Sequence, residues 1–196
     1  MATRSEKRIS VADYERMFSE GLLTEDDHVE LLEGVVRPME PIGAAHIGCV
    51  IALTRLFAHR VPVELKLLIQ SPVELSPDEM PEPDFALLRP DPHDYRKHRP
   101  TPADVQFLIE VCDTSLERDL MEKLPRYAAA GIAEVWLVDL PGQRLLRFRE
   151  PAGAVYRRAD VFARGDALAP ESCPDARLTL DEILGPPLAD SESAGA

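Results

Sequence analysis

The pattern of hydrophobic and polar positions predicts a chain in which helices alternate with short strands. From residue 43 to about residue 59, His46, Val50, Leu53 and Phe57 recur at helical spacing and mark one buried face. Residues 105–111 (VQFLIEV) are apolar on both faces, which is typical of a central strand that is covered on each side. The pattern therefore indicates an α/β fold with helices packed against a sheet.

The remaining helices and strands are predicted from helix-capping residues, turn residues and the alternation of apolar and polar positions. Ser10 and Asp13 form a predicted capping box for a helix that Gly21 ends. Further strands are predicted at residues 28–37 (broken by a turn at 33–34), 63–75, 83–88, 133–139, 144–150 and 154–158. A second capping box at 114–117 predicts a helix to about residue 130, and residues 178–184 predict a last amphipathic turn.

Length and composition limit the class of protein. A chain of 196 residues with 45% hydrophobic and 29% charged residues is expected to form a single domain over residues 1–188, followed by a disordered tail at 189–196. Cys49, Cys112 and Cys173 lack the spacing of a zinc site or a disulfide framework, so a reducing cytoplasm is expected. No apolar run is long enough to span a membrane.

The charge balance argues against tight, sequence-independent binding of DNA. The chain has 22 Lys and Arg residues against 35 Asp and Glu residues, a formal net charge of −13. Such a charge repels phosphate backbones at long range, although screening leaves room for a local binding site. Five arginines near the C-terminal hairpin could contact phosphate or could keep an exposed edge soluble: Arg144, Arg147, Arg149, Arg157 and Arg158.

Three ionisable residues are predicted to converge. Glu110 lies within the apolar strand, so its carboxylate needs a cation, a metal ion or strong hydrogen bonds; capping by backbone amides at the strand end is the structural alternative. Lys123 lies within the apolar stripe of the following helix and is aimed at the sheet, unless it extends to solvent beside Asp119. Asp84 begins the strand at 84–88. Two carboxylates and a lysine on two strands and a helix are typical of a divalent-cation site.

Several segments in this order resemble the Uma-two family of restriction endonucleases, a branch of the PD-(D/E)XK nuclease superfamily. The resemblance covers about residues 11–184 and is carried by VADYERM, HVELLEG, the helix with His46, QSPVEL, EPDFALL, FLIEVCDTS, RDLMEKLPRYAAAGIAEVWLVD and LTLDEIL. It implies a restriction-endonuclease-like core, an α+β fold with a mixed sheet flanked by helices.

The resemblance also implies roles for individual residues. Asp84 and Glu110 would be the metal ligands for Mg²⁺ or Mn²⁺, and Lys123 would be the catalytic lysine, displaced onto the helix because Cys112 stands at its usual position. Glu30 and His46 match accessory positions; a core histidine is an equal alternative for His46. Pro125 departs from the family pattern and could shift Lys123.

Two functions remain open from the sequence. The first is a metal-dependent nuclease that acts on weakly held nucleic acid, DNA more than RNA, and forms a homodimer as the family resemblance suggests. The second is a non-catalytic protein-interaction module that retains the nuclease fold. Retention of Asp84, Glu110 and Lys123 together favours the first. If Lys123 serves the metal-bound water, its replacement by Met is expected to preserve or increase stability, because it removes a partly buried charge, and to lower turnover.

Overall fold

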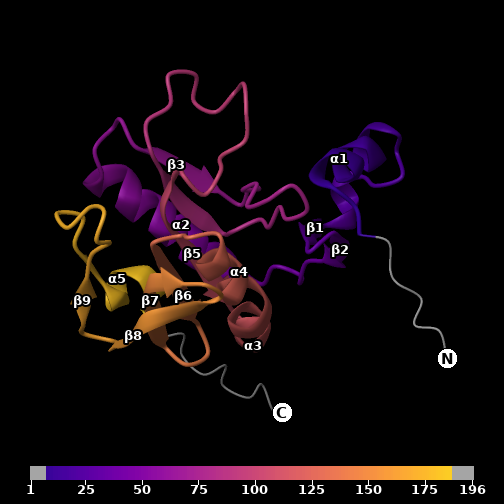
Figure 1. Ribbon diagram of the computed structural model, residues 1–196. Helices are drawn as coiled ribbons and strands as arrows, with labels where there is room; N and C mark the ends of the chain where they lie inside the picture. Colours follow the sequence, from indigo (N-terminus) through magenta and orange to yellow (C-terminus); the bar gives the residue numbers. More distant parts are fainter. Residues whose placement is uncertain (1–7, 187–196) are drawn as a thin grey trace, which may run out of the picture.

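A six-stranded sheet in the order β3-β4-β5-β6-β7-β8 forms the centre of the computed structural model, which describes residues 8–186 (Figure 1). The predicted tail at residues 189–196 lies outside the described residues. The sheet is mixed, because β5 and β6 run parallel while every other neighbouring pair is antiparallel. Its strands are β3 (Lys66–Ile69), β4 (Phe85–Leu88), β5 (Val105–Cys112), β6 (Glu134–Asp139), β7 (Arg144–Ala152) and β8 (Val155–Ala163).

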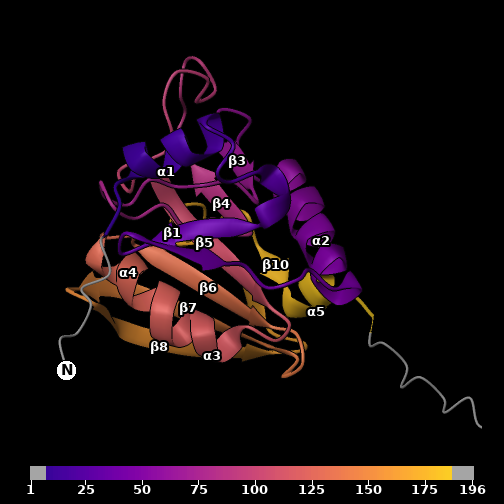
Figure 2. The same cartoon turned by 90° about the vertical axis from the view of Figure 1, so that its right-hand side faces the viewer.

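Helices cover both faces of this sheet, as Figure 2 shows. The helix α2 (Ala44–Arg60) and the short α5 (Leu180–Leu184) pack on one face, where Phe57 meets the rings of Phe85 and Trp136. The other face is covered by α3 (Leu116–Arg118), a π-helical turn (Asp119–Lys123) and α4 (Leu124–Ala129). The expected mixed sheet flanked by helices is therefore confirmed.

A smaller N-terminal unit packs beside the sheet. It contains α1 (Val11–Ser19), a 3₁₀ turn (Glu25–Asp27) and a hairpin of β1 (Val29–Leu32) and β2 (Val35–Pro38). The predicted capping box is present, since the Ser10 hydroxyl accepts from the Asp13 N–H. Glu33 and Gly34 both have positive φ, at 50° and 71°, as the predicted hairpin turn requires. A further short pair is formed by β9 (Ala167–Leu168) and β10 (Leu178–Thr179).

Two predicted elements differ from the structure. The strand expected over residues 63–75 is limited to Lys66–Ile69, because Gln70 takes a φ of 41° and Pro72 has no N–H to continue the ladder. The helix expected from residue 114 to 130 has no capping box at its start: Thr114 bonds Glu40. That helix is also divided by the π-helical turn.

Three further features of the described residues concern the cysteines, the β6–β7 hairpin and the helices. Cys49, Cys112 and Cys173 are free and buried. The predicted strands at 133–139 and 144–150 pair as the hairpin of β6 and β7, and Asp139 accepts from the Gly142 N–H in the turn between them. Within residues 8–186, none of the helices combines the length and the apolarity needed to cross a membrane.

Candidate active site

Antiparallel pairing of β4 with β5 brings the two predicted carboxylates together. Phe85 pairs with Ile109, so Asp84, just before β4, lies beside the C-terminal end of β5. One oxygen of Asp84, Oδ2, accepts a hydrogen bond of 2.8 Å from the backbone N–H of Val111. The convergence of Asp84 and Glu110, inferred from strand positions alone, is therefore present in the structure.

Glu110 is buried on the face of the sheet that carries α4. The Tyr127 hydroxyl donates to Oε1 of Glu110 at 2.5 Å, and the Lys123 ammonium lies 3.2 Å from the same oxygen. The carboxylate is thus held by side chains rather than by the backbone amides of the structural alternative. Burial raises the pKa of Glu110 to about 8, against the opposing effect of Lys123.

Lys123 is buried between two acidic side chains. Its ammonium is 3.2 Å from Glu110 and 3.3 Å from Glu30, and only 7% of the residue is exposed. Burial opposes the charge, but the carboxylates of Glu110, Glu30 and Asp119 outweigh this effect and raise the pKa of Lys123. The ammonium does not extend to solvent, so the alternative of a surface pair with Asp119 is wrong.

The π-helical turn sets the position of Lys123. The N–H of Leu124 bonds the carbonyl of Asp119, five residues back, in place of the usual four. The wider turn keeps both Asp119 and Lys123 buried against the sheet. Pro125 follows within the first turn of α4, where its missing N–H leaves no bond of that helix unmade.

Glu30 reaches the site from the N-terminal hairpin. The Arg118 guanidinium donates to its Oε1 at 2.9 Å, and the Glu82 N–H donates to its Oε2 at 3.2 Å. Glu30 is 2% exposed, so these partners and Lys123 together compensate a buried charge. The structure therefore places the predicted accessory residue within the site, whereas Glu33, on the exposed turn of the hairpin, instead pairs with Arg126.

His46 also joins the site. Its Nε2 lies 2.9 Å from Oδ1 of Asp84, at the start of α2. The hydrogen bond with Asp84 raises the pKa of His46, while burial opposes it. The other ring nitrogen, Nδ1, is buried and has no hydrogen-bond partner among the described residues. His46 is thus a member both of the buried α2 face and of the acidic site.

The sequence did not identify three further groups that shape this site. Arg118 and Tyr127 hold Glu30 and Glu110, and Asp119 accepts hydrogen bonds from the Ser115 hydroxyl and the Cys112 thiol, at 2.6 and 3.3 Å. Tyr127 lies on the same helical stripe as Lys123, and this shared position in the sequence could have predicted that it faces the site. The sequence around Arg118 does not indicate its role, because its partner Glu30 is 88 residues away in the chain.

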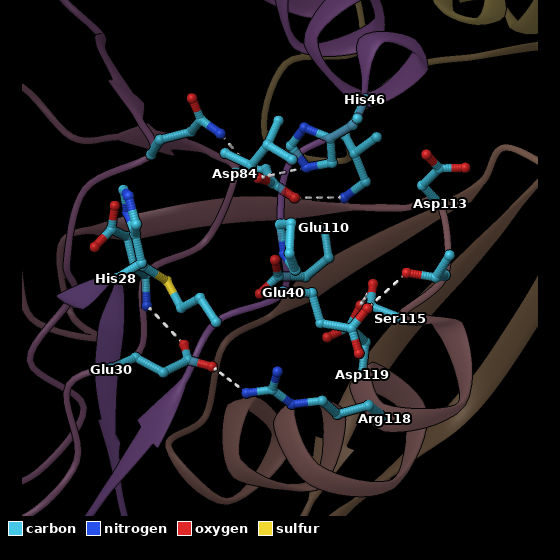
Figure 3. A pocket seen from close by; sticks show the side chains of 18 of the residues that line it. His28, Glu30, Glu40, His46, Asp84, Glu110, Asp113, Ser115, Arg118 and Asp119 are labelled. Atoms are coloured by element: carbon cyan, nitrogen blue, oxygen red, sulfur yellow. Dashed lines mark hydrogen bonds and ion pairs between the residues drawn. The ribbon is translucent and has the colours of Figure 1, made fainter. Parts of the chain in front are cut away.

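The five predicted site residues, together with Arg118 and Asp119, line a cavity of about 490 Å³ (Figure 3). In this view His28 lies at one end of the cavity and Asp113 at the other, with Asp84 and Glu110 between them. Seven carboxylate residues line it, against Lys123 and Arg118 as permanent cations: Glu30, Glu40, Glu82, Asp84, Glu110, Asp113 and Asp119. An excess of negative charge in a partly enclosed space favours a cation.

The donor set suits a hard divalent ion. Within the described chain, the hydrogen bond from Tyr127 and the ion pair with Lys123 both go to Oε1 of Glu110, which leaves Oε2 free for a ligand. No group of three or more His, Cys, Asp or Glu side chains in residues 8–186 forms a ready-made metal cage. Mg²⁺ commonly binds through one or two carboxylates and keeps water or phosphate oxygens for its other positions. Asp84 and Glu110 fit that requirement.

Comparison with known proteins gives a family and a fold. The model of the Uma2 family, described as "Putative restriction endonuclease", matches residues 11–181. A crystal structure of "a putative nuclease belonging to DUF820" from Anabaena variabilis has a TM-score of 0.68 with this chain at 16% identity. The alignment covers 90% of this chain and 97% of the other, so the two share a fold. No curated protein matches the chain in sequence.

Proposed function

Because the chain belongs to the Uma2 family, we propose that it is a metal-dependent nuclease of the PD-(D/E)XK type that hydrolyses phosphodiester bonds. The observation that carries the proposal is the meeting of Asp84, Glu110 and Lys123 in one acidic cavity. The three residues come from a strand start, a strand end and a helix, and the chain maintains a buried lysine among carboxylates there. An interaction surface has no need of such a buried charge cluster.

Each of the three residues has a distinct part in the proposed reaction. Asp84 and Glu110 would hold Mg²⁺ or Mn²⁺, which would supply Lewis-acid chemistry to the scissile phosphate and its attacking water. Hydrogen bonds hold both carboxylates in place: the Val111 N–H donates to Asp84, and the Tyr127 hydroxyl donates to Glu110. Lys123, held 3.2 Å from Glu110, orients the attacking water and stabilises the charge that develops on the phosphate.

Four of the five arginines near the C-terminal hairpin are paired with carboxylates. Arg147 and Arg149 pair with Asp160, Arg144 pairs with Asp139, and Arg158 pairs with Glu150. For these four the pairs support the second interpretation, that they keep a strand edge soluble, whereas Arg157 is exposed and has no ion pair among the described residues. With a net charge of −13, we infer that the substrate is held weakly and locally at the site.

A cleavage assay tests the proposal directly. Single- and double-stranded DNA and RNA are incubated with Mg²⁺ or Mn²⁺, and with chelator. We expect metal-dependent cleavage, of DNA more than RNA, that Asp84→Ala abolishes and the exposed Asp175→Ala leaves intact. Folded wild-type protein that cuts none of these substrates with either ion would contradict the proposal and favour the interaction module.

A further inference from the structure

A second cavity, of about 630 Å³, adjoins the candidate active site. It lies between α1 with its following loop and the segments around residues 70–72 and 80–82. Four residues line both cavities: His28, Met39, Gln70 and Glu82. A molecule in the second cavity is therefore separated from the candidate active site by no more than a shared side chain.

The walls of the second cavity suit a flat, largely apolar ligand. Tyr14 and Phe18 on α1 meet edge to face, with ring centroids 5.1 Å apart and an interplanar angle of 86°. The Tyr14 hydroxyl donates to the carbonyl of Val29 at 2.8 Å, which anchors its ring. Met39 and Met80 add thioether side chains to the lining. Aromatic rings and soft sulfur atoms are favourable contacts for a planar aromatic group.

The charges of this cavity select against phosphate. Its acidic lining residues are Glu15, Glu25 and Glu82, and its arginine, Arg99, is already paired with Glu15. A phosphate group is repelled by such a wall, whereas a neutral base with an amino group donates to a carboxylate. In the adjoining site the cations Lys123 and Arg118 are likewise paired with carboxylates, so phosphate would be held there through the proposed metal ion.

We propose that the second cavity is a nucleobase-binding subsite that receives the unstacked base next to the scissile phosphate. Phe18 provides the stacking surface, and Glu82 accepts from an exocyclic amino group, so adenine, cytosine or guanine is preferred over thymine. The inference rests on the proposed nuclease function and narrows its substrate to single-stranded or locally opened nucleic acid, because a base within a duplex cannot enter. Weak binding of duplex by an acidic protein agrees with this choice.

Mapping of cut sites tests the subsite. Wild-type protein and Mg²⁺ act on a randomised single-stranded DNA pool, and the base composition beside each cut is read. We expect depletion of thymine at one flanking position. Phe18→Ala and Phe18→Leu, the second of which keeps apolar volume without a ring, are expected to lose this bias and to cut about tenfold more slowly. Leu22→Ala, an exposed residue outside the cavity, is the matched control.

Strands with an abasic position beside the cut separate stacking from catalysis. Wild type and Phe18→Ala should cleave such a strand at equal rates, because neither has a base to stack. Cleavage by wild type without any flanking preference, or a preference that both Phe18 variants retain, would overturn the subsite while leaving the nuclease proposal in place.

A binding measurement without cleavage tests the base subsite independently of the proposed nuclease activity. Calorimetric titration in chelator compares deoxyadenosine monophosphate with deoxyribose 5-phosphate, which has no base. We expect the nucleotide to bind wild type about tenfold more tightly and Phe18→Ala no more tightly than the sugar phosphate. Such binding by a protein that never cleaves would support the subsite and refute the nuclease. Equal affinity of wild type for the two compounds would refute the subsite.

Discussion

The Lys123 ammonium lies between the buried carboxylates of Glu30 and Glu110. Removing a buried cation leaves its partners as uncompensated charges, so Lys123→Met is predicted to cost about 3–5 kcal/mol of unfolding free energy. The sequence led to the opposite expectation, because the pattern of the helix shows an apolar stripe and does not show the two carboxylates. We predict in addition a loss of cleavage on the order of 10²–10³.

Urea unfolding and single-turnover cleavage together measure the two effects of Lys123→Met. The exposed Lys97→Met serves as the control and should leave both values unchanged. Wild-type cleavage by a folded Lys123→Met protein would refute the catalytic part of the assignment, even if Asp84→Ala were inactive.

Divalent-cation binding is a second property that depends on single residues. Ligand binding to the native state alone stabilises it by about 2.7 kcal/mol at a hundredfold excess over the dissociation constant. We predict that Mg²⁺ or Mn²⁺ raises the melting temperature of wild type, that chelator reverses the rise, and that Asp84→Ala does not respond. Calorimetric melting curves check this, with Asp175→Ala as control. An equal rise in Asp84→Ala would locate the ion elsewhere.

The sequence predicts those features of the site that depend on a local pattern, and it does not predict pairs between residues that are far apart along the chain. The alternation of β5 correctly separates Glu110 from Ile109 and Val111, because side chains of a strand point to opposite faces. The pairing of Glu30 with Arg118 depends on how the N-terminal hairpin packs over the α3 region. No periodicity within either segment contains that information.

Among the elements, the π-helical turn shows the limit of periodicity arguments. A uniform helix from residue 114 to 130 predicted the direction of Lys123 correctly, yet the bond from Leu124 to Asp119 shows that the helix is not uniform. π-Helical turns occur frequently at functional sites, where they alter the direction of one side chain without ending the helix. The apolar stripe identifies the buried face of the helix. The extra residue of the π-helical turn then determines which polar side chains lie on that face.

The contact between α2 and α5 gives a pH-dependent prediction. The Arg60 guanidinium bonds Glu182, and this interaction lowers the pKa of Glu182 to about 2. A depressed folded-state pKa contributes stability above the usual value of 4.5, and this contribution is lost as pH falls through about 2. Because the Glu182 side chain is 38% exposed, solvent screening limits the contribution to about 1 kcal/mol or less.

Arg60→Met is therefore predicted to lower the unfolding free energy at neutral pH, with a difference from wild type that narrows steadily below about pH 4.5. Denaturant unfolding at several pH values measures it. Arg55→Met, an exposed residue of the same helix, should show no such narrowing. A difference that stayed constant between neutral pH and pH 3 would show that packing of the arginine stem, and not its charge, stabilises the contact.

At the scale of the whole molecule, the two edge strands of the sheet differ in their exposure to solvent. Strand β3 at one edge has four half-buried residues, whereas β8 at the other is nine residues long and exposes Val155 and Val161 by 62% and 64%. An open edge presents unpaired backbone groups to another chain. Of the two arginines on β8, Arg158 is paired with Glu150 on the neighbouring strand, and Arg157 is exposed. The single domain expected over residues 1–188 stays a prediction, as does the dimer.

We propose that two copies of the chain pair through β8 to form a homodimer with two-fold symmetry. Sedimentation equilibrium over micromolar concentrations is expected to show the dimer mass for wild type. Val161→Asp adds a charge to the exposed edge strand and should shift the equilibrium at least tenfold toward monomer, since pairing of the two copies would bury that charge in the interface. Val63→Asp replaces a valine that is 86% exposed after α2, away from this edge, and should leave the dimer unchanged. A wild-type monomer throughout the range would refute the dimer, and a dimer that tolerates Val161→Asp would show that the two copies meet at another surface.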